Sequence, residues 1–188
     1  MPLQVRPLDA ETWPAFAELV ERNNGVFGGC WCLGFHPEGG QRGLDRRALK
    51  QERVENGRAH AALVFDEAGA AQGWCQYGGP EELTRIKHRR EYDKQPPPGP
   101  DWRITCFYVD TKHRRQGIAR AALAGALDQI ALAGGGLVEG ISEVTTGRTA
   151  HGRFLFTATV ELFEDLGFTR VRQVGKHAWI VNRTVDAA

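Results

Sequence analysis

The stretch from residue 103 to residue 141 limits the possible folds of this chain more than any other. Residues 103–109 (RITCFYV) are apolar and rich in β-branched and aromatic side chains, which predicts a central strand. A basic loop follows, and then apolar residues recur at helical spacing as far as Ile130. Three glycines at 134–136 end this helix, and residues 137–141 begin another strand. A crossover of this kind places its two strands parallel, so the stretch predicts a βαβ unit.

The N-terminal half reads as a strand, two helices and a hairpin. Residues 3–8 alternate as a short strand, and Asp9 is a plausible cap for a helix that runs to about Arg22. A loop rich in glycine and aromatic residues spans 23–43, and a second helix is expected over 44–56. The apolar runs 61–65 and 72–77 flank a turn, which predicts an antiparallel hairpin.

The remaining segments predict a surface excursion and a C-terminal hairpin. Residues 81–101 are charged and then proline-rich, so we interpret them as a surface insertion, with a lid as one role. A last helix is expected over 154–166, where Gly167 stops it. Strands at 168–174 and 177–185 then pair across Gly175 and Lys176.

Length and composition indicate one ordinary soluble domain over residues 1–188. Hydrophobic residues make up 41% and charged residues 25% of the chain, and no apolar run approaches a membrane span. The net charge of +1 argues against nucleic acid or an anionic membrane as a partner. Because no secretory signal is apparent, we expect a cytoplasmic protein whose four cysteines are free thiols.

The junction between the central strand and the following helix is suited to an anion. Gly117 and Ala119 leave the first helical turn bare, while Arg114, Arg115 and Arg120 surround it with positive charge. Free backbone N–H groups at a helix start, reinforced by the helix dipole, bind phosphate oxygens that small side chains allow to approach. The junction therefore predicts a pyrophosphate site.

Two motifs resemble the GNAT superfamily of N-acetyltransferases. Residues 114–119 (RRQGIA) match the family signature Gln/Arg-x-x-Gly-x-Gly/Ala after a strand, and residues 161–168 (ELFEDLGF) resemble its helix ending in Gly-Phe. The predicted order of elements matches the family over nearly the whole chain. The resemblance implies an α/β fold with a mixed, mostly antiparallel sheet, splayed central parallel strands and flanking helices.

The resemblance also implies the chemistry. Acetyl-CoA would be the acyl-donor substrate, no metal would take part, and the amine of a small molecule or protein would attack the thioester directly. The resemblance implies a monomer or a homodimer, since a GNAT-like domain often pairs through its terminal strands. Coenzyme A would lie between the splayed strands, with its pantetheine along the first strand and its pyrophosphate on the helix start. The implied cofactor-binding residues are Phe107, Tyr108, Val109, Arg114, Arg115, Gln116, Gly117, Ile118, Ala119, Arg120 and Phe163.

The groups that move protons are less clear from sequence. Phe163 stands where the family often has a tyrosine that protonates the leaving thiolate, so water or another residue would do this, or the thiolate would leave unprotonated. Strand alternation would place Arg103, Thr105 and Phe107 on one face, which the resemblance implies is the face of the reacting centre, although none of the three is an effective base. A water chain is one alternative for the base. The candidate catalytic residues are Glu139, Glu143, Tyr77 and Thr105.

The loop at residues 28–36 is the expected acceptor pocket, because the family places the connection between its first two helices there. Cys30, Cys32 and His36 also suggest zinc, but a fourth ligand is not nearby, so we expect no metal. Core packing of Trp31 and Phe35 is the competing interpretation. The expected substrate-binding residues are Cys30, Trp31, Cys32, Phe35 and His36.

Two other functions fit less of the sequence. A non-catalytic acyl-CoA sensor is compatible with Phe163 and with the absence of an obvious base. A polyanion or protein interaction module could use the basic junction, but the near-neutral net charge argues against it. Thioester turnover separates the first alternative from an enzyme, and preference for polyanions over coenzyme A would reveal the second.

Overall fold

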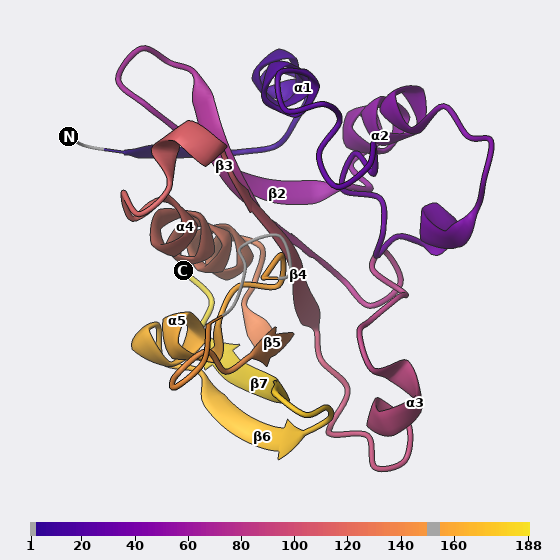
Figure 1. Ribbon diagram of the computed structural model, residues 1–188, viewed down its shortest axis with the longest axis vertical. Helices are drawn as coiled ribbons and strands as arrows, with labels where there is room; N and C mark the ends of the chain where they lie inside the picture. The colour runs from indigo at the N-terminus through magenta and orange to yellow at the C-terminus, as the bar shows by residue number, and fades with distance from the viewer. Residues whose placement is uncertain (1–2, 150–154) are drawn as a thin grey trace.

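The computed structural model describes residues 3–149 and 155–188, and its centre is one mixed β-sheet (Figure 1). Within these residues seven strands follow the order β1-β2-β3-β4-β5-β7-β6, and all neighbours are antiparallel except β4 and β5. The predicted mixed, mostly antiparallel fold is confirmed. The strands are β1 Gln4–Pro7, β2 His60–Phe65, β3 Ala71–Gly78, β4 Trp102–Val109, β5 Gly136–Glu143, β6 Thr169–Gln173 and β7 Ala178–Val185.

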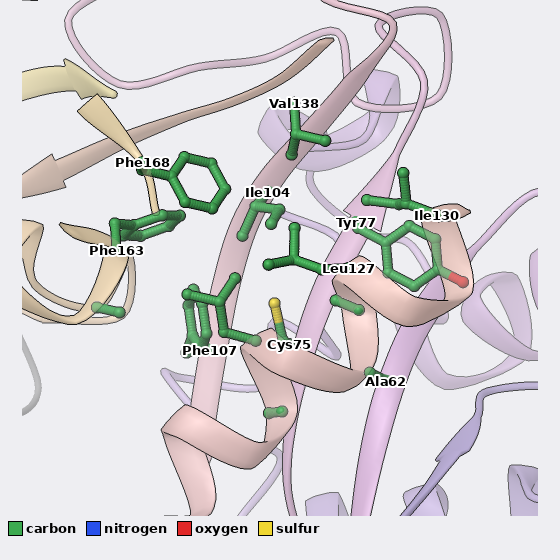
Figure 2. Close-up of a cluster of buried hydrophobic side chains, with 14 of the residues drawn as sticks. Ala62, Cys75, Tyr77, Ile104, Phe107, Leu127, Ile130, Val138, Phe163 and Phe168 are labelled. Atoms are coloured by element: carbon green, nitrogen blue, oxygen red, sulfur yellow. The ribbon is translucent and has the colours of Figure 1, made fainter. Parts of the chain in front are cut away.

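Helices cover both faces of this sheet. The α-helices are α1 Trp13–Glu21, α2 Arg46–Glu55, α3 Arg89–Tyr92, α4 Ile118–Leu132 and α5 Val160–Asp165, with 3-10 turns η1 Pro37–Gly40 and η2 Thr111–His113. On one face, α4 and α5 pack over a core that includes Ile104, Phe107 and Phe163 (Figure 2). On the other face, α1 and α2 pack over a second core around Phe16 and Trp74. The sheet therefore carries two hydrophobic layers.

The two parallel strands separate after a short contact. Trp102, Arg103 and Ile104 of β4 pair with residues 138–140 of β5, and no parallel pairing between the two strands continues beyond that point within the described residues. Opposite this split, the register between β3 and β4 shifts between Cys75 and Tyr77. The predicted splayed pair is therefore present, and its opening lies beside an irregularity of β4.

This irregularity makes one sequence expectation wrong. Strict alternation would put Thr105 and Phe107 on one face, but Phe107 packs in the α4 core whereas Thr105 accepts a hydrogen bond from Gln76, at 3.2 Å. The extra residue of a β-bulge shifts the side-chain pattern by one position. Thr105 and Phe107 therefore serve opposite faces of the sheet.

Two predicted helix boundaries also differ. The last helix begins at Val160 rather than at Phe154, which lies outside the described residues, because Thr159 caps it and Ala158 has a left-handed φ of 58°. Asp9 is not the cap of α1. Its carboxylate accepts the N–H groups of Glu11 and Thr12 in the preceding turn, and Thr12 holds the N-cap position.

The charged excursion at residues 81–101 is attached to the sheet. It forms the short helix α3, and its side chains Leu83 and Tyr92 are buried. Arg172 of β6 donates hydrogen bonds to the carbonyls of Glu91 and Tyr92, at 3.0 and 3.1 Å. The excursion therefore covers the β5 side of the sheet. Among the described helices, none has both the length and the apolar character to cross a membrane.

Candidate active site

The turn before α4 exposes the predicted phosphate-binding groups. Arg114, Arg115, Gln116 and Gly117 are all exposed, and Gly117 holds the N-cap position with a φ of 80° that favours glycine. The first intrahelical backbone bond runs from Ala121 N–H to the Gly117 carbonyl, at 2.9 Å. The backbone N–H groups in the first turn of α4, before Ala121, therefore have no partner within the helix and are available to an anion.

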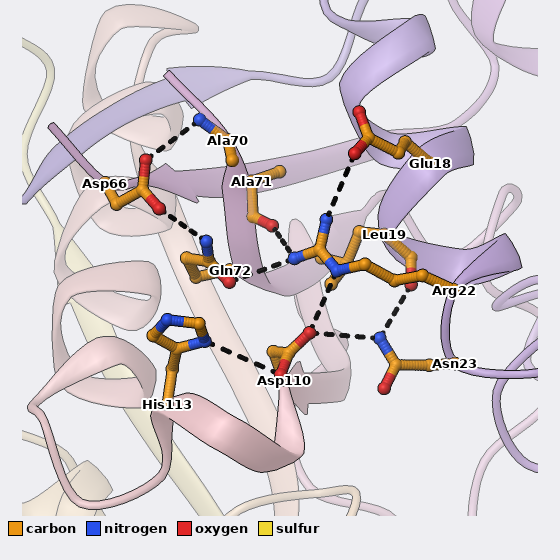
Figure 3. A network of polar contacts seen from close by, with 10 residues as sticks. All are labelled: Glu18, Leu19, Arg22, Asn23, Asp66, Ala70, Ala71, Gln72, Asp110 and His113. Carbon is orange, nitrogen blue, oxygen red and sulfur yellow. Dashed lines mark hydrogen bonds and ion pairs between the residues drawn. The ribbon is translucent and has the colours of Figure 1, made fainter. Parts of the chain in front are cut away.

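A polar network holds this turn in place (Figure 3). Asp110 follows β4 directly, and its carboxylate accepts the backbone N–H of Lys112, at 2.9 Å, and side-chain bonds from Arg22 and Asn23, at 3.0 and 3.2 Å. Burial opposes ionisation of Asp110, but these donors outweigh it and lower its pKa to about 2. Arg22 also donates to the carbonyl of Ala71, at 2.6 Å. The network thus ties α1 and β3 to the loop that leads into α4.

An elongated cavity, the β4–α5 cleft, extends from this turn along β4. Its volume is about 350 Å³. The N–H of Phe107 points toward it and donates to the carbonyl of Phe156, at 2.6 Å, while Asp110 N–H bonds Gln72 of β3 on the other edge. Backbone alternation then directs the Val109 N–H toward the cleft as well. The lining residues are Phe27, Phe107, Tyr108, Val109, Arg114, Ala119, Leu155, Phe156, Ala158, Thr159 and Leu162.

A narrow polar opening, the β4–β5 slot, lies where the parallel strands separate. Its volume is about 10 Å³, which is room for roughly one water-sized group. The Thr157 hydroxyl beside it is buried and has no hydrogen-bond partner among the described residues, and neither has Arg103 Nε. The slot therefore offers unsatisfied polar atoms to a small polar group. It is lined by Phe35, Ile86, Lys87, Arg103, Ile104, Thr105, Glu139, Gly140, Ile141 and Thr157.

Glu139 is the carboxylate of this slot. Its side chain is buried, and the hydroxyl of Tyr92 donates to its two oxygens, at 3.2 and 2.9 Å. Burial raises the pKa of Glu139, although Tyr92 and the Arg103 guanidinium, 3.9 Å away, act in the opposite direction. A carboxylate with a raised pKa next to an opening for a small polar group is suited to accept a proton.

The other predicted catalytic residues have different surroundings. Glu143 forms ion pairs with Lys87, at 3.1 Å, and Arg148, at 2.6 Å, which outweigh its burial and lower its pKa. Thr105 lines the slot with Glu139. Tyr77 lies under α4 on the opposite face, where its hydroxyl donates to Gln129 at 2.8 Å. The structure therefore brings Glu139 and Thr105 together and places Tyr77 elsewhere.

A third cavity, the phenylalanine chamber, adjoins the first two. Its volume is about 210 Å³, and it shares Phe27 and Phe156 with the cleft and Phe35 with the slot. Of the five residues predicted for the acceptor, Trp31 stacks on Trp13 and His36 contacts Lys50, so neither lines the chamber. The lining residues are Phe27, Cys30, Cys32, Gly34, Phe35, Cys106 and Phe156.

A buried polar cluster lies behind the chamber. Lys50 is fully buried, and its Nζ donates to the Cys32 carbonyl and to Gln76 Oε1, both at 3.3 Å, and lies 3.4 Å from His36 Nε2. Burial lowers the pKa of Lys50. In the described part of the chain, no group of three or more His, Cys, Asp or Glu side chains could hold a metal ion.

Sequence reasoning missed several residues of these cavities. Phe27 and Phe156 lie in segments with no helical or strand periodicity, and Lys50 sits in a polar helix where burial is unexpected. Asp110 gave the clearest signal, since an acidic side chain directly follows a buried strand. Phe163, predicted to contact the cofactor, is buried against Phe107 and Phe168 and does not line the cleft.

Comparisons with known proteins agree with this architecture. The family model described as acetyltransferase (GNAT) family matches residues 30–168, and the chain belongs to that family. No curated protein sequence matches it significantly. Structural similarity is nevertheless extensive, with low sequence identity.

Three solved structures illustrate the shared fold. A Corynebacterium glutamicum protein described as histone acetyltransferase HPA2 and related acetyltransferase has a TM-score of 0.56 at 18% identity, covering 100% of this chain and 98% of its own. A phosphinothricin acetyltransferase from Sinorhizobium meliloti, solved in complex with AcCoA, gives 0.55 at 14% identity, with 99% and 90% coverage. The Escherichia coli ribosomal-protein-S18-alanine N-acetyltransferase gives 0.51 at 13%, with 100% and 96% coverage.

Proposed function

We propose that this protein is an N-acetyltransferase of the cytoplasm that transfers an acetyl group from acetyl-CoA directly to a primary amine of a small molecule or protein. The proposal rests on the order in which three features follow one another along β4: the open first turn of α4, the β4–α5 cleft and the slot containing Glu139. They provide, in sequence along β4, an anion site, a channel for an extended chain and a proton acceptor.

In the proposed complex, the pyrophosphate of acetyl-CoA binds the first-turn N–H groups of α4 beside Arg114. The pantetheine pairs with the edge of β4 at Phe107 and Val109, in the manner of an added strand. The Phe107 N–H exchanges its bond to the Phe156 carbonyl for one to the donor. Backbone N–H groups near the β4 bulge polarise the thioester carbonyl.

The acceptor occupies the slot as an ammonium and gives one proton to Glu139, and the resulting neutral amine attacks the thioester. The C–N bond forms as the C–S bond breaks, the electron pair of the C–S bond leaves on sulfur as the coenzyme A thiolate, and the nitrogen passes its second proton to water. Phe163 has no proton to give, so water protonates the thiolate. Glu139 then releases its proton to solvent, which completes the cycle.

Calorimetric titration with acetyl-CoA tests the first step. Wild type and Arg114→Glu are compared, with Arg90→Glu as the matched control because Arg90 is also exposed and lies away from the cleft. We expect at least a ~10-fold weaker Kd for Arg114→Glu and no change for the control, since a carboxylate repels the pyrophosphate. Absence of binding by the wild type would refute the proposal. Binding without turnover of any amine would favour the sensor alternative.

A further inference from the structure

The phenylalanine chamber is uncharged as well as apolar. Its lining contains three phenylalanines, three cysteines and a glycine, with no acidic or basic side chain. Burial raises the pKa of Cys30 to about 11, so its thiol is protonated at neutral pH. The Cys32 thiol donates to Gln76 Oε1, although hydrogen bonds from Cys106 and Trp74 and the charge of Lys50 outweigh burial and lower the pKa of Cys32. A charged group would lose its hydration in this chamber without gaining a partner.

The size and walls of the chamber suit an aromatic ring. An apolar cavity of about 150 Å³ holds benzene in another protein, and this chamber measures about 210 Å³. The ring of Phe156 lies 5.7 Å from that of Phe27 and 6.1 Å from that of Phe35, both in tilted arrangements. These rings contact one another, so a planar ligand would lie against them inside the chamber and would meet both ring faces and ring edges, the geometry that aromatic pairs prefer.

The position of the chamber determines how such a ring would be attached. Phe35 belongs to both the chamber and the slot, so a molecule with its amine beside Glu139 needs only a short linker to reach the chamber. Phe27 and Phe156 form the border with the cleft, which keeps the ring next to the donor. We propose that the acceptor is a monoamine joined by a short alkyl chain to an aryl group. This inference rests on the proposed acetyltransferase function.

The charged residues of the slot disfavour other amines. Lys87 is paired with Glu143, and Arg103 donates to the Leu83 carbonyl at 2.8 Å and lies near Glu139. Lys87 already has an anionic partner, and although Arg103 Nε has no hydrogen-bond partner among the described residues, it lies 3.9 Å from the Glu139 carboxylate, which would repel the carboxylate of an amino acid. A diamine would have to place its second ammonium in the uncharged chamber, at a high cost in desolvation.

The test compares acceptors by the N-acetylated product formed from acetyl-CoA. Benzylamine and 2-phenylethylamine represent the proposed class, and ethylamine, 1,4-diaminobutane and glutamate represent the others. We expect kcat/KM for the aryl amines to exceed the rest by at least ~10-fold, because ring burial adds binding energy that the smaller amine lacks. Equal or higher kcat/KM for the diamine or for glutamate would overturn the inference and leave the acetyltransferase function standing.

Gly34→Leu is the variant that addresses the chamber itself. Gly34 lines the chamber, and a Cβ there meets no atom within 4 Å, so a leucine at its rim is accommodated without a clash and narrows access to the chamber. Gly99→Leu is the matched control, because Gly99 is equally open and lies in the proline-rich excursion. Gly34→Leu should raise KM for benzylamine at least ~10-fold while leaving kcat/KM for ethylamine and the Kd of acetyl-CoA unchanged. Cys30→Met serves the same purpose if Gly34→Leu fails to unfold cooperatively.

Two further measurements separate the outcomes. Fluorine NMR of 4-fluorobenzylamine with the coenzyme A complex should show line broadening that Gly34→Leu abolishes, independently of turnover.

The second measurement compares kcat/KM for phenylacetyl-CoA and acetyl-CoA as donors, with ethylamine as the acceptor. If the larger donor is preferred and Gly34→Leu removes that preference, the chamber holds the acyl group and the aryl-amine inference is wrong. Absence of acetyl-CoA binding would instead refute the proposed function on which the inference rests.

Discussion

The Nε atom of Arg22 lies 3.0 Å from Oδ2 of Asp110, and this ion pair joins the end of α1 to the strand end that leads into the turn before α4, the proposed pyrophosphate site (Figure 3). The two residues are far apart in sequence, and their pairing fixes the turn before any ligand arrives. Preorganised backbone donors bind an anion without first losing conformational freedom. The ion pair is therefore expected to affect both stability and binding of the donor.

Asp110→Asn should lower the free energy of unfolding by about 2 kcal/mol at neutral pH, because the folded state holds the Asp110 pKa near 2, below its ordinary value. A lowered carboxyl pKa contributes stability at neutral pH, and this contribution is lost as pH falls from about 4 toward the folded value. Urea unfolding at several pH values should show the two proteins converging in acid. Asp93→Asn, at an exposed side chain, is the control, and equal stability of Asp110→Asn and wild type at pH 7 would contradict the assignment.

Glu139→Gln should lower kcat at least ~100-fold with little change in the Kd of acetyl-CoA, because it removes the proton acceptor but not the donor site. Steady-state kinetics at neutral pH measure this effect. Glu143→Gln is the matched control: its carboxylate is held by Lys87 and Arg148, and we expect kcat within a few-fold of wild type. A similar loss of kcat in Glu139→Gln and Glu143→Gln would contradict the assignment of Glu139 as the proton acceptor.

Tyr92→Phe should move the acidic limb of the pH–rate profile to higher pH. The Tyr92 hydroxyl donates to Glu139 and favours its ionised form, so its loss raises the Glu139 pKa further. Because the base must be deprotonated, activity then appears only at higher pH, while kcat on the alkaline side changes little. Tyr77→Phe is the control. It removes a hydroxyl that donates to Gln129 of α4, and the acidic limb of its pH–rate profile should match that of the wild type. If the acidic limbs of the Tyr92→Phe and wild-type pH–rate profiles coincide, Glu139 is not the base.

Apart from the short helix α3, the order of elements could be predicted from the sequence because each element depends on local patterns. The βαβ stretch and the turn at residues 114–117 combine hydrophobic periodicity with glycine and arginine at fixed offsets. The β4 bulge could not be predicted, since it depends on pairing with β3 rather than on β4 itself. Bulge position in turn decides which face receives Thr105 and Phe107. One residue of register therefore places Phe107 on the opposite face of the sheet from Thr105, where the sequence predicted a shared face.

The candidate site residues also divide into those that the sequence could indicate and those that only the structure reveals. Loop residues such as Cys30 and Phe35 could be associated with a pocket from the resemblance, but their partners Phe27 and Phe156 come from segments without a periodic signal. The choice between Glu139 and Glu143 required structure as well. Both lie on β5, but burial dominates at Glu139 and raises its pKa, whereas hydrogen bonds and ion pairs with Arg148 and Lys87 outweigh burial at Glu143 and lower its pKa.

Lys50→Met should remove a pH dependence of stability that the wild type shows. Burial lowers the folded pKa of Lys50, with Cys32 and Glu82 acting in the opposite direction. Between that lowered value and about 10.4, the unfolded chain binds more protons than the folded one, so wild-type stability rises with pH. The stability of Lys50→Met relative to wild type should therefore be greatest in mildly acidic solution and decline toward about pH 10. Urea unfolding across this range measures the trend, with Lys94→Met as the control because the Lys94 side chain is 62% exposed. Parallel curves for Lys50→Met and wild type would mean that Lys50 titrates alike in the folded and unfolded chains, whereas a converging pair would establish a buried amine of lowered pKa directly behind the phenylalanine chamber.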